Sequence, residues 1–211
     1  MNYYQRFWTN SMASGRYTHQ DIPDETGFDM CIRQIEKVFK VLPFTPVKCL
    51  EVGCGRGFES SLLSKHVWTI ATDYAEEPLI DARKAYPDIE FRQADVTALP
   101  FKDREFDMVY MQSVMEHILD TEMMFKELNR VLSIGGCVVT ILPEHNFLKN
   151  LAVLFQWDKF FHPYNSHIRF YSRKTLKKAF EENGFEVLHY EPMIRYFGVP
   201  STMMMIARKI R

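Results

Sequence analysis

Short apolar runs alternate with stretches of helical spacing along most of the chain. The runs that predict buried strands are residues 47–52, 67–73, 89–95, 106–112 and 136–143. Helical patterns follow several of them, marked by Phe58, Leu62 and Leu63, by residues 75–86, by Met124, Leu128, Val131 and Leu132, and by residues 172–184. Two final apolar runs, residues 185–191 and 201–209, predict strands with no helix between them.

This alternation predicts an α/β fold of the doubly wound type, with a mostly parallel sheet and helices on both faces. The last two strands are expected to form an antiparallel pair at one edge, because no crossover helix separates them. In such sheets, ligands bind beyond the carboxyl ends of the strands, near the point where the strand order reverses. Polar side chains end four of the predicted strands: Glu51, Asp73, Asp95 and Gln112.

A glycine-rich loop follows the first predicted strand in the stretch LEVGCGRG. Because it opens a helix, its N–H groups and the positive end of the helix are expected to face a ligand. Asp73 lies 20 residues after Gly53, where a carboxylate can accept from both hydroxyls of a ribose. The competing interpretation is a tight turn that binds nothing, with Asp73 and Asp95 capping local turns.

The spacing of the glycines separates several classes of nucleotide site. Dinucleotide loops follow G-x-G-x-x-G, but Phe58 stands at the place of the third glycine here. No G-K-[ST] ends the turn, which excludes a phosphate-binding P-loop. The loop therefore favours an adenosyl group with a carboxylate tail over a pyrophosphate.

Composition narrows the class further. The length of 211 residues fits one domain, and a net charge of −1 does not favour a dedicated nucleic-acid binder. The four cysteines form no C-x-x-C pair, so neither a disulfide framework nor a metal site is expected. No signal peptide and no membrane span are predicted, and a cytoplasmic protein is expected.

Five stretches in order resemble the successive motifs of the class I S-adenosylmethionine-dependent methyltransferases, small-molecule branch: LEVGCGRG, ATDYAEEPL, FRQADVTALPF, FDMVYMQSVMEHI and RVLSIGGCVVTILP. The resemblance covers residues 45 to 208. It implies a Rossmann-like sheet of seven strands with an antiparallel last strand, and S-adenosyl-L-methionine as cofactor.

The resemblance also assigns cofactor-binding roles. Gly53, Gly55 and the Cys54 backbone would lie against the methionine part, with Glu51 near its amino group. The remaining implied contacts are Asp73 with the ribose, Tyr74 beside the adenine, Asp95 and the Val96 N–H with the adenine edge, and Gln112 and Ser113 at the other side of the methionine.

Methyl transfer from a sulfonium needs positioning and exclusion of water more than it needs a catalytic triad. A general base is required only if the acceptor must lose a proton. His117 and His145 are the candidates for such a base. The alternative is that His117 builds the start of a helix and that His145 is a solvated loop residue.

The chain divides into regions within one domain, residues 1–211. The predicted regions are an N-terminal helical lid or substrate segment (1–44), a cofactor-binding core (45–142), a substrate-side insertion (143–171), and a last helix with edge strands (172–211). Aromatic residues are frequent in 1–24 and 143–171, which predicts an apolar acceptor pocket.

A small-molecule acceptor is expected, with O, N, S and C nucleophiles all open, and the protein is expected to be a monomer or homodimer. Three alternatives remain. An aminopropyltransferase would need an acidic pocket after the fourth strand, for which Glu116 and Asp120 are available. A non-catalytic scaffold of the same fold and an NAD(P)-dependent oxidoreductase are the others.

Overall fold

The computed structural model describes residues 25–146, 168–196 and 199–211. The predicted aromatic segment 1–24 and most of the predicted insertion 143–171 lie outside these residues. The described elements are α2 (Glu25–Val41), β1 (Lys48–Val52), α3 (Phe58–Leu63), β2 (Trp68–Asp73), α4 (Glu76–Ala85), β3 (Glu90–Gln93), β4 (Phe106–Gln112), the short 3₁₀ helix η1 (Met115–His117), α5 (Thr121–Val131), β5 (Leu132–Pro143), α7 (Arg173–Glu182), β6 (Phe185–Tyr196) and β7 (Val199–Lys209).

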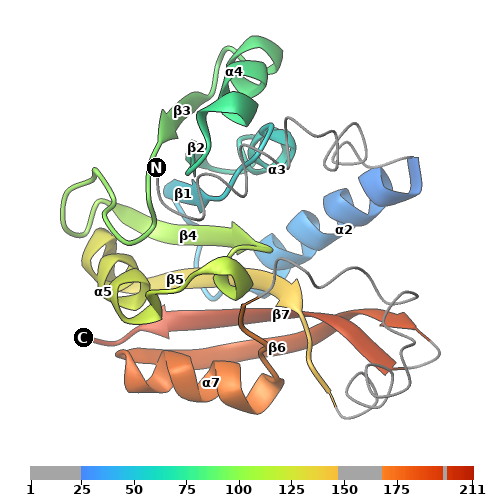
Figure 1. Cartoon of the computed structure of the whole chain (residues 1–211), viewed down its shortest axis with the longest axis vertical. Helices are drawn as coiled ribbons and strands as arrows, with labels where there is room; N and C mark the ends of the chain where they lie inside the picture. Colours follow the sequence, from blue (N-terminus) through green and yellow to red (C-terminus); the bar gives the residue numbers. More distant parts are fainter. Residues whose placement is uncertain (1–24, 147–167, 197–198) are drawn as a thin grey trace.

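Seven strands form one sheet in the order β3-β2-β1-β4-β5-β7-β6 (Figure 1). The first five strands pair in parallel, and β7 is antiparallel to both β5 and β6. The strand order reverses between β1 and β4, which places the switch point beside the loop that follows β1. The predicted α/β fold class and the antiparallel pair at one edge are confirmed.

The helices cover two faces because strand side chains alternate. Leu50 of β1 and Val109 of β4 belong to the apolar core under α5 and α7. Their neighbours Cys49 and Met108 point to the opposite core, under α2 and α3. All four side chains are fully buried, as expected for parallel strands covered on both sides.

The predicted boundaries around β3 and α5 were wrong. The third strand ends at Gln93, so Asp95 lies in the turn beyond it, in an isolated bridge with Ala98. The helical pattern was extended to Leu132, but α5 ends at Val131 and Leu132 pairs with Phe106 as the first residue of β5. A buried leucine satisfies the helical period and the strand equally well, so the pattern could not separate them.

The last strands are longer than predicted. β6 continues to Tyr196, past the predicted end at residue 191, because its ladder with β7 persists through three register shifts. In the described part of the chain, no helix is long and apolar enough to cross a membrane.

Candidate cofactor and acceptor site

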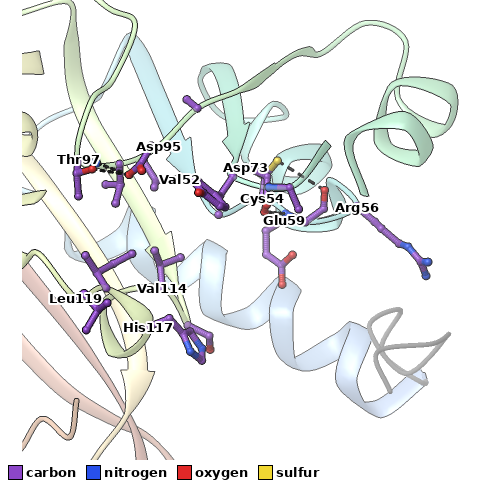
Figure 2. Close-up of a pocket in the computed structure, with 18 of the residues that line it drawn as sticks. Val52, Cys54, Arg56, Glu59, Asp73, Asp95, Thr97, Val114, His117 and Leu119 are labelled. Carbon is purple, nitrogen blue, oxygen red and sulfur yellow. Dashed lines mark hydrogen bonds between the residues drawn. The ribbon is translucent and has the colours of Figure 1, made fainter. Parts of the chain in front are cut away.

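A cavity of about 450 Å³ opens at the carboxyl ends of β1, β2 and β4 (Figure 2). Four segments build it: the glycine loop after β1, the turn after β2, the turn after β3 and the turn after β4. Its lining residues are Val52, Gly53, Cys54, Gly55, Arg56, Phe58, Glu59, Asp73, Tyr74, Ala75, Ala94, Asp95, Val96, Thr97, Ser113, Val114, His117, Ile118, Leu119 and Asp120. The cavity therefore lies at the switch point, where doubly wound sheets bind ligands.

The glycine loop bends through left-handed backbone conformations. At Gly53, with φ of 76°, a Cβ atom would lie 2.3 Å from Cγ2 of Val114, so the loop is packed against the turn after β4. At Gly55, with φ of 52°, a Cβ atom would have no heavy atom within 4 Å. Gly55 lines the cavity, so a side chain there would meet a ligand first.

A second close approach occurs at Gly57, the N-cap of α3. A Cβ atom there would lie 2.7 Å from the Phe91 ring of β3. Gly57 thus provides the close helix-to-strand packing that the missing third glycine provides in dinucleotide sites. The replacement lies one residue before Phe58 and explains why the G-x-G-x-x-G spacing is absent.

The prediction that the N–H groups of the loop would be free to face a ligand is wrong for three of them. The amides of Gly53 and Cys54 donate to the Thr72 carbonyl at 2.7 and 2.9 Å, and the Gly55 amide donates to Oδ2 of Asp73 at 2.8 Å. These three donors are satisfied inside the protein. The loop is therefore not an anion cradle of the phosphate-binding type, which fits a ligand without a pyrophosphate.

Asp73 ends β2 with both carboxylate oxygens engaged. Oδ2 accepts from the Gly55 amide, and Oδ1 accepts from the Ala75 amide at 2.9 Å. Burial raises the pKa of Asp73 above its usual value, while these N–H bonds act in the opposite direction. Asp73 therefore caps the turn and lines the cavity at once, since each oxygen has a further lone pair for a ligand hydroxyl.

Asp95 lies across the cavity, in the turn after β3. Its Oδ1 accepts from the Thr97 amide at 2.8 Å and from the Thr97 hydroxyl at 2.7 Å. Val96, between them, is buried and lines the cavity. The predicted capping role and the predicted site position of Asp95 are therefore found together.

Glu51 and Gln112 do not line the cavity. Glu51 is 2% exposed, and its Oε2 accepts from the Ser60 hydroxyl. Burial, followed by the charge of Glu59, raises the pKa of Glu51 to about 8. Gln112 accepts from the Tyr110 hydroxyl at 2.6 Å and donates to Glu59 at 3.2 Å. Both residues therefore lie behind the lining: Glu51 is bonded to Ser60, next to Glu59 in the chain, and Gln112 is bonded to Glu59 itself.

Glu59 lines the cavity, although the sequence did not single it out. Its Oε1 accepts from Gln112 and from the Cys31 thiol of α2, the latter at 3.8 Å. An acid in the first turn of a helix usually interacts with the helix dipole, so its sequence context gave no signal. Figure 2 shows its carboxylate reaching from the glycine-loop side toward α2. Thr97 and Asp120 also line the cavity without having been predicted as cofactor contacts.

Ser113, Tyr74 and His117 line the cavity, and His145 does not. Ser113 has a positive φ of 53°, a strained conformation that often marks functional sites, and its amide donates to the Ile141 carbonyl. The His145 amide donates to Tyr171 at 2.8 Å, and its ring lies 5.1 Å from that of Phe170. Of the two histidines predicted as a possible base, His117 therefore lies in the cavity lining and His145 lies outside it.

These features define an α/β protein with a nucleoside-type cavity at its switch point. The open side of Gly55, two carboxyls at strand ends and internally satisfied loop amides fit an adenosyl ligand with an amino-acid tail. Among the described residues, the charged side chains of the lining are the acids Glu59, Asp73, Asp95 and Asp120 and the base Arg56, which pairs with Asp81 at 3.5 Å. An acidic lining suits a ligand that carries positive charge.

The chain belongs to the class I S-adenosylmethionine-dependent methyltransferases. Residues 24–190 match the family described as "Methyltransferase domain". A demethylmenaquinone methyltransferase from Chlorobaculum tepidum is 30% identical over 165 residues, 69% of this chain and 68% of the relative. A phosphatidylethanolamine N-methyltransferase from Cereibacter sphaeroides is 26% identical over 152 residues, 69% of this chain and 73% of the relative. S-adenosylmethionine is accordingly the cofactor, and the protein is an enzyme.

Solved structures share the fold. A putative methyltransferase from Bacillus halodurans superposes with a TM-score of 0.69 and 19% identity, covering 85% of this chain and 99% of that one.

Proposed function

We propose that this enzyme transfers the methyl group of S-adenosylmethionine to a small-molecule acceptor by in-line displacement. The observation that carries the proposal is the convergence of Gly53, Asp73, Asp95 and Ser113 from four different segments on one cavity. The bound cofactor would supply an activated methyl group with a neutral leaving group. The protein then has to hold the cofactor and present the acceptor in line with it.

In this proposal Asp73 binds the ribose hydroxyls, and Asp95 with the Val96 amide binds the adenine edge. The glycine loop lies against the methionine part. Glu59, which lines the cavity, is closer to the methionine side than the buried Glu51, which would act through the hydroxyl of Ser60 and the loop.

An acceptor with an apolar part is favoured by the far rim of the cavity. Leu119 lines the cavity and is 60% exposed, and the amide of Ile168, itself 43% exposed, donates to Glu116 of the same turn. Phe170 follows and is 51% exposed. One exposed apolar side chain in the cavity lining, with two more on the segment bonded to the same turn, supports an acceptor with an apolar part. The names of the two relatives, which act on demethylmenaquinone and on phosphatidylethanolamine, agree with such an acceptor.

The aminopropyltransferase alternative needs Glu116 and Asp120 in one acidic pocket. Asp120 lines the cavity and caps α5 by accepting from the Met123 amide at 3.0 Å, whereas Glu116 is buried and is not part of the lining. The family assignment favours methyl transfer. We also propose the division into a core of 45–142 and substrate-side segments 1–44 and 143–171.

Isothermal titration with S-adenosylhomocysteine tests the cofactor assignment. Asp73→Asn should weaken binding by roughly 1–3 kcal/mol, because the ribose hydroxyls lose a carboxylate acceptor. Asp88→Ala, which changes an exposed acid after α4, is the control and should bind as the wild type does. Equal affinity of Asp73→Asn and wild type would refute the ribose role. Melting temperatures of both variants separate loss of binding from loss of the Gly55 and Ala75 hydrogen bonds.

A further inference from the structure

The turn after β4 is clamped to the segment that precedes α7. The Glu116 carbonyl accepts from the Ile168 amide at 3.0 Å and from the Arg169 amide at 3.1 Å. The Arg169 guanidinium donates to the carbonyls of Ile118 at 3.0 Å and Leu119 at 2.7 Å. Four hydrogen bonds thus fix the turn whose side chains face the cavity from the side opposite the glycine loop (Figure 2).

Inside this clamp lies a carboxyl group that has no hydrogen-bond partner among the described residues. Glu116 is 2% exposed, and neither of its carboxylate oxygens is bonded to any group in the described part of the chain. Glu144, at the end of β5, provides the contrast. It is 8% exposed, and the Tyr190 hydroxyl donates to its two oxygens at 2.9 and 2.8 Å. Buried polar groups are normally paired, so an unpaired carboxyl next to a cavity calls for a functional explanation.

The charged groups near Glu116 do not explain why its carboxyl is buried without a partner among the described residues. The titratable groups on the elements around it are His117 on its own turn, Arg169 and Tyr171 before α7, and Glu144, which is bridged to Tyr171. Burial raises the pKa of Glu116 to about 7. A carboxyl held near neutrality is suited to take up or release a proton at the pH of the cell.

We propose that Glu116 is the general base for the acceptor, a role that rests on the proposed methyl transfer. The acceptor supplies an electron pair, either the lone pair of an amine nitrogen or the π pair of a ring carbon made electron-rich by loss of its neighbouring hydroxyl proton. This pair forms a bond to the methyl carbon, and the carbon–sulfur bond breaks with its electrons passing to sulfur. The acceptor O–H or N–H proton passes to an oxygen of Glu116, which becomes a neutral carboxylic acid and later returns the proton to water. His117 and Ile118, adjacent in the chain, line the cavity, so the turn that carries Glu116 borders it. The proposal requires the Glu116 side chain to turn toward the cavity when the acceptor binds.

This assignment differs from the sequence prediction, in which His117 or His145 was the candidate base. His145 lies outside the cavity lining, and its amide donates to the Tyr171 carbonyl. In the sequence prediction, Glu116 was considered only as part of the acidic pocket of an aminopropyltransferase. Its burial without a partner, which the sequence cannot show, changes its interpretation.

The test uses the full chain with labelled S-adenosylmethionine and two probes, a short-chain demethylmenaquinol and vesicles containing phosphatidylethanolamine. Glu116→Gln keeps the shape but cannot accept the proton, and Glu116→Met removes the polar group altogether. Both should bind S-adenosylhomocysteine as the wild type does, while kcat falls by about 10²- to 10⁴-fold. Glu144→Gln, a buried carboxyl whose tyrosine bond an amide can keep, is the matched control and should stay within about threefold of wild type in kcat.

The pH profile separates a base from a structural residue. In the wild type kcat should rise with pH through about 7, where Glu116 loses its proton, and this limb should be absent in Glu116→Gln. Variants that keep both kcat and the limb would overturn the proposal. A lower kcat with an unchanged limb would also overturn it, since that result indicates a purely structural role.

A second measurement needs no acceptor. With carboxyl-labelled glutamate, the ¹³C signal that disappears in Glu116→Gln is followed against pH in the S-adenosylhomocysteine complex. A midpoint near 7 supports the base, whereas ionisation below about pH 5.5, close to an unperturbed glutamate, contradicts it. If the protein binds S-adenosylhomocysteine but methylates neither probe, the apolar acceptor is wrong and this titration still decides the role of Glu116.

Discussion

The carboxyl edge of the sheet has two sides that stabilise their acidic groups differently. On the cofactor side, formed by the ends of β1, β2 and β3, every predicted acid accepts a hydrogen bond: Glu51 from Ser60, Asp73 from two amides and Asp95 from Thr97. On the side that we assign to the acceptor, formed by residues 115–119 and 168–171, Glu116 accepts none from the described residues. The acids of the cofactor side are thus held in place by the protein, whereas in our proposal the acceptor is the partner of Glu116.

The largest loss of stability is expected where the glycine loop packs against the turn after β4. Gly53→Ala would force a Cβ atom to within 2.3 Å of Val114 Cγ2 at a φ of 76°. Backbone strain and overpacking together should cost about 2–5 kcal/mol of unfolding free energy. Urea unfolding measures it. Gly135→Ala is the control, because φ there is 84° and a Cβ atom meets nothing within 4 Å, so it reports strain alone.

Gly53 and Val114 together allow a sharper test of the contact between the glycine loop and the turn after β4. Val114→Ala removes the methyl groups that a Cβ atom at residue 53 would strike. The double variant should therefore regain part of the stability lost by Gly53→Ala, relative to the sum of the single changes. Simple additivity would mean that the loop and the turn are not in contact.

A second effect concerns pH and separates Glu51 from Glu116. The pKa of Glu51 is raised from 4.5 to about 8 in the folded protein, so between these values the folded state keeps a proton that the unfolded state has lost. The contribution to stability is therefore complete below pH 4.5 and is lost as pH rises toward 8, by about 1.4 kcal/mol per pKa unit at most.

Glu51→Gln should flatten this decline, and Glu116→Gln should flatten only the part below about pH 7. Unfolding free energies measured from pH 4 to 9 check both. Parallel curves for Glu51→Gln and the wild type would show that Glu51 is ionised in the fold.

The smallest effect is expected on the exposed clamp. Arg169→Ala removes two hydrogen bonds to the carbonyls of Ile118 and Leu119, which should cost about 1 kcal/mol of stability. The KM for the acceptor should rise while S-adenosylhomocysteine affinity stays unchanged. Arg33→Ala, an exposed residue of α2 paired only with α2 groups, should change neither. Equal loss of cofactor affinity in Arg169→Ala would place the clamp on the cofactor side.

Two of the four strand ends marked by a polar residue were predicted correctly, because an acidic or amide residue closes the apolar run there. Asp73 ends β2 and Gln112 ends β4 as expected. Leu132 was misassigned because its burial suits a helix and a strand alike, and Glu59 was missed because it looks like an ordinary first-turn acid. The unpaired state of Glu116 depends on residues about 50 positions away that hold its turn, so no local pattern could reveal it.

In the described part of the chain, the residues that line the cavity fall between Val52 and Asp120. The rim that we assign to the acceptor depends also on residues after β5. Recombination at the end of β5 could therefore exchange acceptor preference while leaving the cofactor cavity intact. A lineage could diversify its substrates by such exchanges, and a chimeric enzyme designed at this junction could do the same.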